Sequence, residues 1–267
     1  MATPPSDPAD EQPLAGGMGS GGAVVRVGGT VRRPVRPWSA TVAAFLRHLE
    51  AVGFQGAPRH LGHDEHGREV LTFIPGDVGV PPFPRWVADD AVLLGVARLQ
   101  HELHQAARSF VAPPAAAWDR PNLPDPGPGA IVCHNDLCVE NVVVRDGRVV
   151  AFIDFDFAAP NDPLLDIAIA ARHWVPVRDP VDVDPDLRGI DQVARFRAFC
   201  AEHGLDEGGR AAVVGHLGAF LDRALVSMRT RAESGLPAYV AAWEAGYPDQ
   251  NRRSRAWLDA NAGALTG

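Results

Sequence analysis

The sequence predicts an α+β fold in which a small N-terminal lobe of antiparallel strands precedes a larger, mainly helical lobe. Short strand patterns separated by glycine-containing turns occupy the chain up to about residue 75. Apolar residues recur mainly at helical spacing beyond residue 166. A chain of 267 residues is long enough for two unequal lobes. We therefore expect an N-terminal lobe over residues 23–75 and a C-terminal lobe over residues 76–267.

The first 22 residues predict a disordered tail. They are rich in proline, glycine and acidic side chains, and such segments bury too little apolar area to offset the entropy of ordering. Gly17, Gly19 and Gly22 have the G-x-G-x-x-G spacing of a phosphate-binding loop. No strand pattern precedes them, so a flexible linker is favoured over a phosphate loop.

The composition restricts the classes of partner and compartment. Asp and Glu number 33 against 25 Lys and Arg, a net charge of -8, which disfavours general binding to nucleic acid or to an anionic membrane. The sequence contains no run of ~18 consecutive apolar residues, which is the length that a membrane span requires. The three cysteines form no CxxC pair, as expected of reduced thiols inside a cell. We expect a soluble, cytoplasmic protein without a nucleic-acid or membrane partner; its oligomeric state is left open.

The N-terminal lobe should contain two hairpins and one helix. Residues 24–33 form two Val/Arg runs joined at a glycine pair, Gly28–Gly29, that suits a tight turn. A helix is expected to begin with an N-cap at Ser39 and to stop at Gly53. A second hairpin should end in an apolar strand over residues 70–74.

The C-terminal lobe should begin with a long helix over residues 85–107, which contains HELH. Zinc proteases space two such histidines four residues apart, but His101 and His104 are three apart, so packing is favoured over metal binding. Further helices are expected over residues 166–174, 191–203, 210–234 and 236–258.

Polar residues cluster around a third predicted hairpin, which joins a strand at 142–144 to one at 149–155 through Asp146–Gly147. Asp136 and Asn141 enter the first strand and Asp154 lies at the far end of the second. Pairing of the strands should bring all three to one edge. Oxygen ligands of this kind suit a hard cation such as Mg²⁺.

The same segment carries a family resemblance. "HNDLCVEN" at residues 134–141 matches the catalytic-loop pattern H-R-D-L-x-x-x-N of the protein-kinase fold, with Asn135 in place of Arg, and "DFD" at residues 154–156 lies where D-F-G would be. The I-D-x-D pattern followed by "NDPLLDIA" more closely resembles the aminoglycoside phosphotransferase and choline-kinase-like family. The resemblance covers roughly residues 24–174 and is strongest over 133–168.

The resemblance implies a role for each polar residue of this segment. Asp136 would be the catalytic base that orients an acceptor hydroxyl and accepts its proton. Asn141 and Asp154 would hold Mg²⁺ on the phosphates of ATP. His134 and Asp166 would support the loop, and for His134 a buried ring bonded to backbone is the favoured interpretation.

Three further positions are less sharply defined. Asp156 either lies near a second metal or caps the next turn, and both interpretations stay open. In this family a basic strand residue pairs with phosphates; Arg32 or Arg33 occupies the matching strand, and Arg33 is preferred because it shares a face with Val31. An exposed strand arginine is an equal alternative. The usual glutamate partner is in doubt because the following helix offers only Glu50.

The nucleotide and acceptor regions follow from the same resemblance. "VLTFIPG" at residues 70–76 resembles the hinge between lobes, where backbone groups of Phe73 and Ile74 would meet adenine; a buried strand is compatible with this. Residues 178–191 carry several carboxylates that would attract an amino sugar or a choline-like amine, although a solvated acidic loop is favoured. Trp174 is placed at the entrance to that site, where it would stack on the acceptor.

The function predicted from the sequence is ATP- and Mg²⁺-dependent phosphorylation of a small-molecule hydroxyl, in the aminoglycoside, choline-like amine or sugar class. One alternative is a catalytically weak, nucleotide-binding pseudokinase-like module, because the orthodox glycine loop is missing and Arg replaces Lys. A metal-dependent hydrolase is a second alternative, but the dense His/Asp ligand set of two-metal sites is missing.

Overall fold

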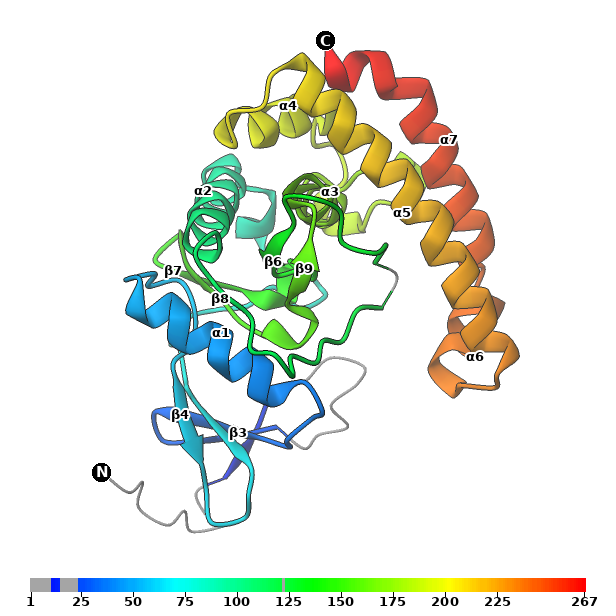
Figure 1. The fold of residues 1–267 in the computed structure, drawn as a ribbon. Helices are drawn as coiled ribbons and strands as arrows, with labels where there is room; N and C mark the ends of the chain where they lie inside the picture. Colours follow the sequence, from blue (N-terminus) through cyan, green and yellow to red (C-terminus); the bar gives the residue numbers. More distant parts are fainter. Residues whose placement is uncertain (1–10, 15–23, 122) are drawn as a thin grey trace.

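The computed structural model describes residues 11–14, 24–121 and 123–267. Figure 1 shows the two lobes, with the small sheet and one helix at the bottom and the helical lobe above. This arrangement confirms the predicted α+β fold. The glycine pattern from Gly17 to Gly22 lies outside the described residues, as does most of the predicted tail. Within that tail, however, Gln12–Pro13 form a short strand that pairs with the next one.

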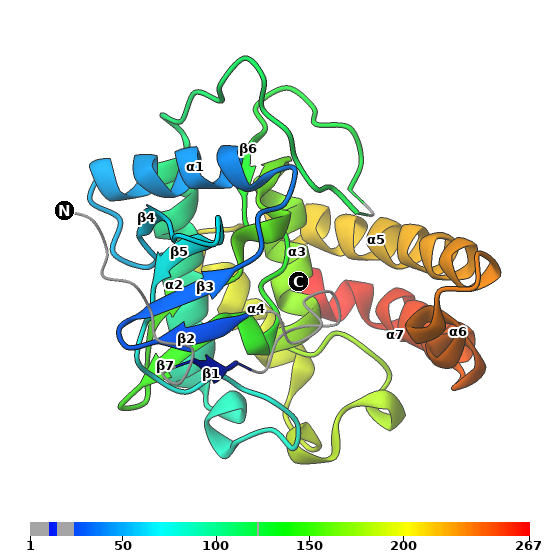
Figure 2. The same cartoon turned by 90° about the horizontal axis from the view of Figure 1, so that it is seen from below.

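The N-terminal lobe is an antiparallel sheet with strand order β1-β2-β3-β5-β4. Gly28 takes a φ of 57° at the turn between β2 and β3, a conformation that costs glycine little. The helix α1 packs beside the sheet (Figure 2). The bounds are β1 (Gln12–Pro13), β2 (Val25–Val27), β3 (Thr30–Arg33), α1 (Ser39–Ala51), β4 (His60–His63) and β5 (Glu69–Thr72).

The predicted N-cap of α1 is wrong by one residue. Trp38 occupies the cap position without a side-chain hydrogen bond, and Ser39 is the first helical residue. The Ser39 hydroxyl instead accepts a hydrogen bond from the Arg36 backbone N–H at 3.0 Å and lies 3.4 Å from Oε2 of Glu69. The serine therefore ties the start of the helix to the sheet.

The C-terminal lobe combines two small antiparallel strand pairs with six α-helices among the described residues. β6 pairs with β9, which the sequence did not predict, and β7 pairs with β8 in the expected hairpin. The strands are β6 (Ile131–Cys133), β7 (Val142–Arg145), β8 (Arg148–Phe152) and β9 (Ala159–Asn161); the helices are α2 (Asp90–Ala107), α3 (Pro163–Trp174), α4 (Gln192–Glu202), α5 (Glu207–Glu233), α6 (Pro237–Glu244) and α7 (Tyr247–Thr266).

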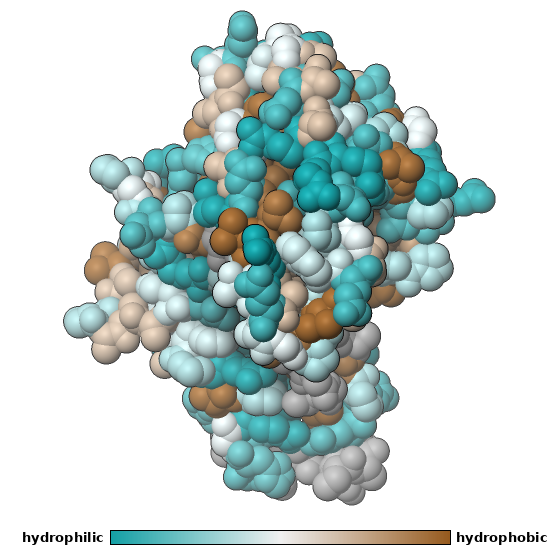
Figure 3. Space-filling view, turned by 90° about the vertical axis from the view of Figure 1, so that its right-hand side faces the viewer, coloured by the Kyte–Doolittle hydropathy of each residue, from teal (hydrophilic) through white to brown (hydrophobic). Residues whose placement is uncertain are grey.

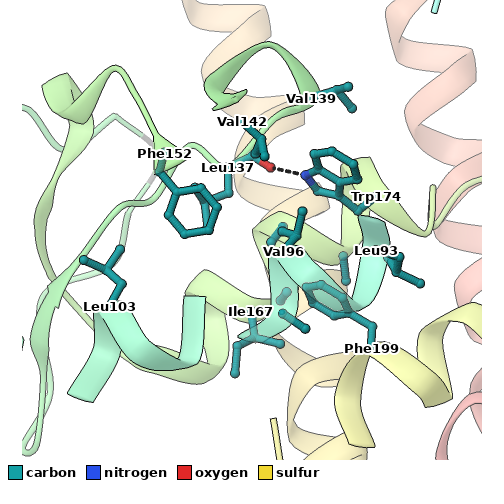
Figure 4. Close-up of a cluster of buried hydrophobic side chains, with 14 of the residues drawn as sticks. Leu93, Val96, Leu103, Leu137, Val139, Val142, Phe152, Ile167, Trp174 and Phe199 are labelled. Carbon is teal, nitrogen blue, oxygen red and sulfur yellow. Dashed lines mark hydrogen bonds between the residues drawn. The ribbon is translucent and has the colours of Figure 1, made fainter. Parts of the chain in front are cut away.

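The core of this lobe lies between α2, α3 and the β7–β8 hairpin. Figure 4 shows the indole of Trp174 in that core, where its Nε1–H donates to the Leu137 carbonyl at 3.1 Å. The side chain is 1% exposed. The predicted place of Trp174 at a substrate entrance is therefore wrong: it supports the loop that follows β6.

The C-terminal helices differ from the prediction mainly in their number, and the last of them runs on to Thr266. The helix expected over residues 236–258 is two helices, α6 and α7, because Gly246 adopts a φ of 97° between them. α5 is long and apolar enough to cross a membrane by length and composition alone. It packs against α3, α6 and α7, and the face on which these helices lie is mostly hydrophilic, with small separate hydrophobic patches (Figure 3).

The connection between the lobes depends on a close approach at Gly76. Its φ is 152°, and a Cβ there would lie 2.5 Å from Val143 Cγ1 and 2.7 Å from the Val144 carbonyl oxygen. We expect Gly76→Ala to lower the free energy of unfolding by about 2 kcal/mol or more, measured in urea. Gly215→Ala is the matched control: Gly215 lies in α5 with nothing within 4 Å, so alanine should stabilise by about 0.5–1 kcal/mol.

Candidate active site

The loop after β6 is fixed by a buried histidine. His134 is fully buried, and its Nδ1 accepts a hydrogen bond from the Asp136 backbone N–H at 3.3 Å. Nε2 therefore carries the proton and donates to the Ile153 carbonyl at 2.9 Å. Burial lowers the pKa of His134, which keeps the ring neutral. The histidine thus joins the loop to the end of β8, the arrangement expected of a supporting residue.

A buried carboxylate holds the same loop from the side of α3. Asp166 is 0% exposed, and it accepts hydrogen bonds from the Asn135 N–H at 2.7 Å and from Gln100 Nε2 and His104 Nε2, both at 2.8 Å. Burial opposes ionisation, but the bonds to His104 and Gln100 prevail and lower the pKa of Asp166. The sequence singled out His104 for a packing role but missed its contact with Asp166, and it missed Gln100 altogether.

This cluster also contains a possible metal-ligand set. The ligand atoms of His104, Cys133 and Asp166 lie within 4.8 Å of one another, and all three residues are buried. Asp166 already accepts three hydrogen bonds, and burial raises the pKa of Cys133 well above its usual value. A neutral thiol is a poor ligand, so the geometry favours the packing role predicted for His104.

Asn135 stands where the H-R-D-L-x-x-x-N pattern has arginine, and it supports the loop through its own hydrogen bonds. Its φ is 65°, and its Nδ2 donates to the carbonyls of Cys133, Phe157 and Ala159 at 3.0–3.2 Å. Its Oδ1 accepts from Asn161 Nδ2 at 2.7 Å. The side chain therefore joins β6, β9 and Phe157, the residue that follows the "DFD" segment. The sequence identified this departure but not Asn161, its partner.

Asp136 and Asn141 face each other at the end of the loop. Asn141 Nδ2 donates to the Asp136 backbone carbonyl at 2.8 Å and to its Oδ2 at 3.0 Å. Burial and the nearby Asp154 raise the pKa of Asp136 to about 6. The Asn141 backbone carbonyl accepts from the Ile153 N–H at 2.9 Å. This hydrogen bond places Asn141 next to the segment that carries Asp154, as predicted from the pairing of the two strands.

Asp154 and Asp156 both lie near one nitrogen of an arginine from the N-terminal lobe. Asp154 has a φ of 59° and its side chain is 48% exposed. Arg33 Nη1 lies 2.7 Å from Asp156 Oδ1 and 3.8 Å from Asp154 Oδ1. Partial burial and Asp156 raise the pKa of Asp154, against the effect of Arg33. Asp156 is therefore an ion-pair partner that links the two lobes.

Arg33, and not Arg32, reaches this edge. Its Nε donates to Glu69 Oε2 at 2.7 Å, and Glu69 lies directly opposite it in the β3–β5 register. Arg32 points to Asp64, with its Nε 3.6 Å from Oδ2. The glutamate partner therefore comes from a neighbouring strand. The helix residue Glu50 instead lies 3.8 Å from Arg59.

The proposed hinge joins the lobes, but one of its amide groups is already used. The Phe73 N–H donates to the Gly29 carbonyl at 2.9 Å, and the Arg26 guanidinium lies 3.9 Å from the centre of the Phe73 ring. Phe73 and Ile74 are both half-buried. Asp77 exchanges two backbone hydrogen bonds of 2.8 Å with Val144. The Phe73 N–H is therefore not free to bind adenine, which would need other backbone groups of this segment.

The proline-rich connection between α2 and β6 adds a carboxylate that the sequence did not single out. Burial and Asp156 raise the pKa of Asp119, with Arg231 opposing them. The Ala117 N–H donates to the Thr41 hydroxyl of α1 at 2.9 Å, which ties this connection to the N-terminal lobe. Asp119 therefore belongs to the same field of negative charge as the "DFD" segment.

The donor set at this edge fits a divalent cation. Asp136, Asn141 and Asp154 present carboxylate and amide oxygens, the ligand types that Mg²⁺ prefers. Burial and, after it, a neighbouring carboxylate raise the pKa values of both aspartates, because each of these effects disfavours the charged form. A dication would lower both pKa values. Asn141 and Asp154 are the residues we expect to hold it.

The burial of Asp136 near Asp154 predicts a gain in stability when the charge of Asp136 is removed. Asp136 has a folded-state pKa of about 6, above the unfolded value of about 3.9, so its ionisation destabilises the folded state as pH rises through this window. In buffer free of divalent cations, Asp136→Asn should raise the free energy of unfolding at pH 7 by about 1–2 kcal/mol, after allowance for partial exposure. Urea unfolding at pH 7 and below pH 4 checks this, because the gain should vanish at the lower pH.

Comparison with known proteins places these residues in a family context. The model of the phosphotransferase enzyme family matches residues 26–199, a span that contains all the site residues described above. The trifolitoxin immunity protein of Rhizobium leguminosarum bv. trifolii is 38% identical over 169 residues, which cover 62% of this chain and 62% of that protein. The chain thus matches less than two thirds of the length of this relative.

Solved structures share the fold at low sequence identity. The amicoumacin kinase hAmiN, solved with AMP-PNP, Ca²⁺ and Ami, has a TM-score of 0.63 at 12% identity, over 96% of this chain and 90% of that one. Choline kinase from Cryptosporidium parvum Iowa II has a TM-score of 0.60 at 11% identity, over 97% and 93%. These likenesses confirm the predicted two-lobed kinase-like fold.

Proposed function

Because this chain belongs to the phosphotransferase enzyme family, we propose that it transfers the γ-phosphoryl group of ATP to a hydroxyl of a small molecule. The observation that carries the proposal is the meeting of Asp136, Asn141 and Asp154 at one edge, facing Arg33 of the other lobe. Phosphoryl transfer requires positioning and charge neutralisation more than covalent chemistry, and this group of side chains supplies both.

Asp136 is proposed as the base. A carboxylate with a pKa of about 6 is largely ionised at neutral pH, yet it accepts a proton more readily than an ordinary aspartate. The hydrogen bond from Asn141 Nδ2 to Oδ2 restricts rotation of the carboxylate and leaves Oδ1 to orient the acceptor hydroxyl. His134 and Asp166 hold the loop in place through their hydrogen bonds to the Ile153 carbonyl and the Asn135 N–H.

The nucleotide is proposed to lie between the lobes, with its phosphates near Arg33. Asn141 and Asp154 would hold Mg²⁺, which when bound neutralises the charge of the phosphate oxygens. Arg33 is kept in place by Glu69 and Asp156, so its guanidinium is positioned before a ligand arrives. ATP is abundant inside cells, and we accordingly propose a cytoplasmic location.

A product assay tests this function. Purified protein with ATP and Mg²⁺ should convert a member of an acceptor panel (aminoglycosides, choline, homoserine and simple sugars) to its phosphorylated form, detected by mass spectrometry, and omission of Mg²⁺ should stop the reaction. Nucleotide binding without any phosphorylated product across a broad panel would instead favour the pseudokinase-like alternative. Product formation at an unchanged rate with EDTA present would contradict the assignment of Asn141 and Asp154.

A further inference from the structure

A pocket of about 260 Å³ lies beside the catalytic loop, on the side of α3. Its walls include two residues of the loop itself, Val139 and Glu140, which directly precede Asn141. The opposite wall comes from the end of α3 and the segment after it. The pocket is smaller than the about 300–1,000 Å³ that hold drug-sized ligands, so it fits a small molecule or one end of a larger one.

Two guanidinium groups, Arg172 and Arg178, line this pocket. Within the described part of the chain, neither has a carboxylate oxygen within 4.0 Å. Arg178 Nη2 lies 3.5 Å from the Arg172 carbonyl oxygen, and the Arg172 guanidinium carbon lies 5.7 Å from the centre of the Phe220 ring. Elsewhere in the protein the buried arginines have close partners, as Arg33 does. These two positive charges are therefore available to a ligand.

The electrostatics of the neighbouring groups agree with this geometry. Burial lowers the pKa of Arg172, and burial together with Arg172 lowers the pKa of Arg178 to about 10. Burial and both guanidinium groups lower the pKa of His173 well below its usual value. The carboxylates Glu140 and Asp184 also line the pocket, and Asp184 and Asp182 partly oppose the lowering of the Arg178 pKa; among the described residues, however, neither arginine forms a close ion pair.

We propose that this pocket binds an oxyanion group, a carboxylate or a phosphate, of the hydroxyl-bearing acceptor through Arg172 and Arg178. The proposal rests on the proposed phosphotransferase function and names its substrate class: an anionic, hydroxylated small molecule. A planar guanidinium binds an oxyanion through two parallel hydrogen bonds. Because the pocket wall and Asp136 belong to the same loop, an acceptor held there by its oxyanion would be anchored beside the base.

This class differs from the cationic acceptors that the acidic composition of residues 178–191 suggested. The segment does contribute Asp184 to the pocket, but it also contributes Arg178. Asp182 in the same segment is paired with Arg253, so part of its negative charge is already neutralised. The guanidinium groups of Arg172 and Arg178 are the charged hydrogen-bond donors that line the pocket.

Binding of inorganic phosphate and of glycerate tests the pocket without turnover. We expect both probes to bind nucleotide-free protein in calorimetry, and glycerol not to bind. Arg178→Gln should weaken binding by about tenfold or more, and Arg178→Lys by less. Arg188→Gln is the matched control, because Arg188 is exposed on the same segment, and it should leave binding unchanged. Arg172→Gln serves as a second variant if the first fails to fold. If phosphate binds more tightly than glycerate, the pocket recognises a phosphate group; if glycerate binds more tightly, it recognises a carboxylate.

Two results would overturn the proposal. One is anion binding that persists in Arg178→Gln and Arg172→Gln but is lost in Arg33→Gln, which would place the anion at the nucleotide site. The other is an acceptor panel in which neutral or cationic alcohols are phosphorylated and Arg178→Gln leaves their kcat/KM unchanged; the phosphotransferase function would then stand without this substrate class. Failure of the phosphotransferase function itself is distinguishable, because it would appear as an absence of phosphorylated product across the whole acceptor panel while the phosphate probe still binds and Arg178→Gln still weakens that binding.

Discussion

Asp136→Asn is expected to lower kcat by about 10²–10⁴-fold, because it removes the group that accepts the proton of the acceptor hydroxyl. The amide has nearly the same shape and still accepts the bond from Asn141, so the loop should keep its structure. ATP affinity should change by no more than about threefold. Steady-state kinetics with the acceptor found by the panel, together with calorimetry of ATP binding, measure the two quantities.

The control for this variant is Asp146→Asn. Asp146 lies in the exposed turn between β7 and β8 with a φ of 53°, a conformation that asparagine tolerates as well as aspartate. Its kcat should equal that of the wild type. An Asp136→Asn protein that retains activity within a factor of about three would remove Asp136 from the mechanism as a base, since general-base catalysis contributes far more than this.

Asp166→Ala should be the most damaging substitution for stability, with a loss of about 3–5 kcal/mol in the free energy of unfolding. It removes the acceptor of three buried hydrogen bonds, from Asn135, Gln100 and His104. The pKa of Asp166 is lowered in the folded state. Its contribution is therefore present above the unfolded value of about 3.9 and is lost as pH falls through the folded-state pKa.

Urea unfolding at neutral pH measures this loss, with Glu233→Ala as the control. Glu233 forms an exposed ion pair with Arg229 one helical turn away, and pairs of this kind contribute about 0.3–0.5 kcal/mol. A loss of less than about 1 kcal/mol in Asp166→Ala would mean that the buried network does not hold the loop.

The sequence predicted those parts of the fold and site that depend on local pattern. Residues 142–152 fold back as expected because apolar runs lie on both sides of Asp146–Gly147, and this hairpin alone brings Asn141 next to Asp154. The choice of Arg33 over Arg32 also followed from strand alternation, since side chains two apart share a face. In both cases the residues concerned lie close together in the chain.

The rest depended on pairing between distant segments. Gln100 and His104 reach Asp166 across 66 and 62 positions, and Glu69 meets Arg33 across 36, so no local spacing indicates these contacts. Trp174 was predicted at the entrance to the acceptor site, because its packing under the loop after β6 depends on how α3 crosses that loop. The Arg172–Arg178 pocket is likewise formed by a helix end and a loop that meet only in the folded chain.

Thermal unfolding measures the proposed binding of ATP with Mg²⁺ at Asp154 and its neighbours. A ligand that binds only the folded state must raise its stability. Millimolar ATP with Mg²⁺ should raise the unfolding temperature of the wild type by several degrees, and this rise should be much smaller with EDTA or in Asp154→Asn. An unfolding temperature that does not respond to millimolar ATP and Mg²⁺ would mean that this site does not bind the nucleotide.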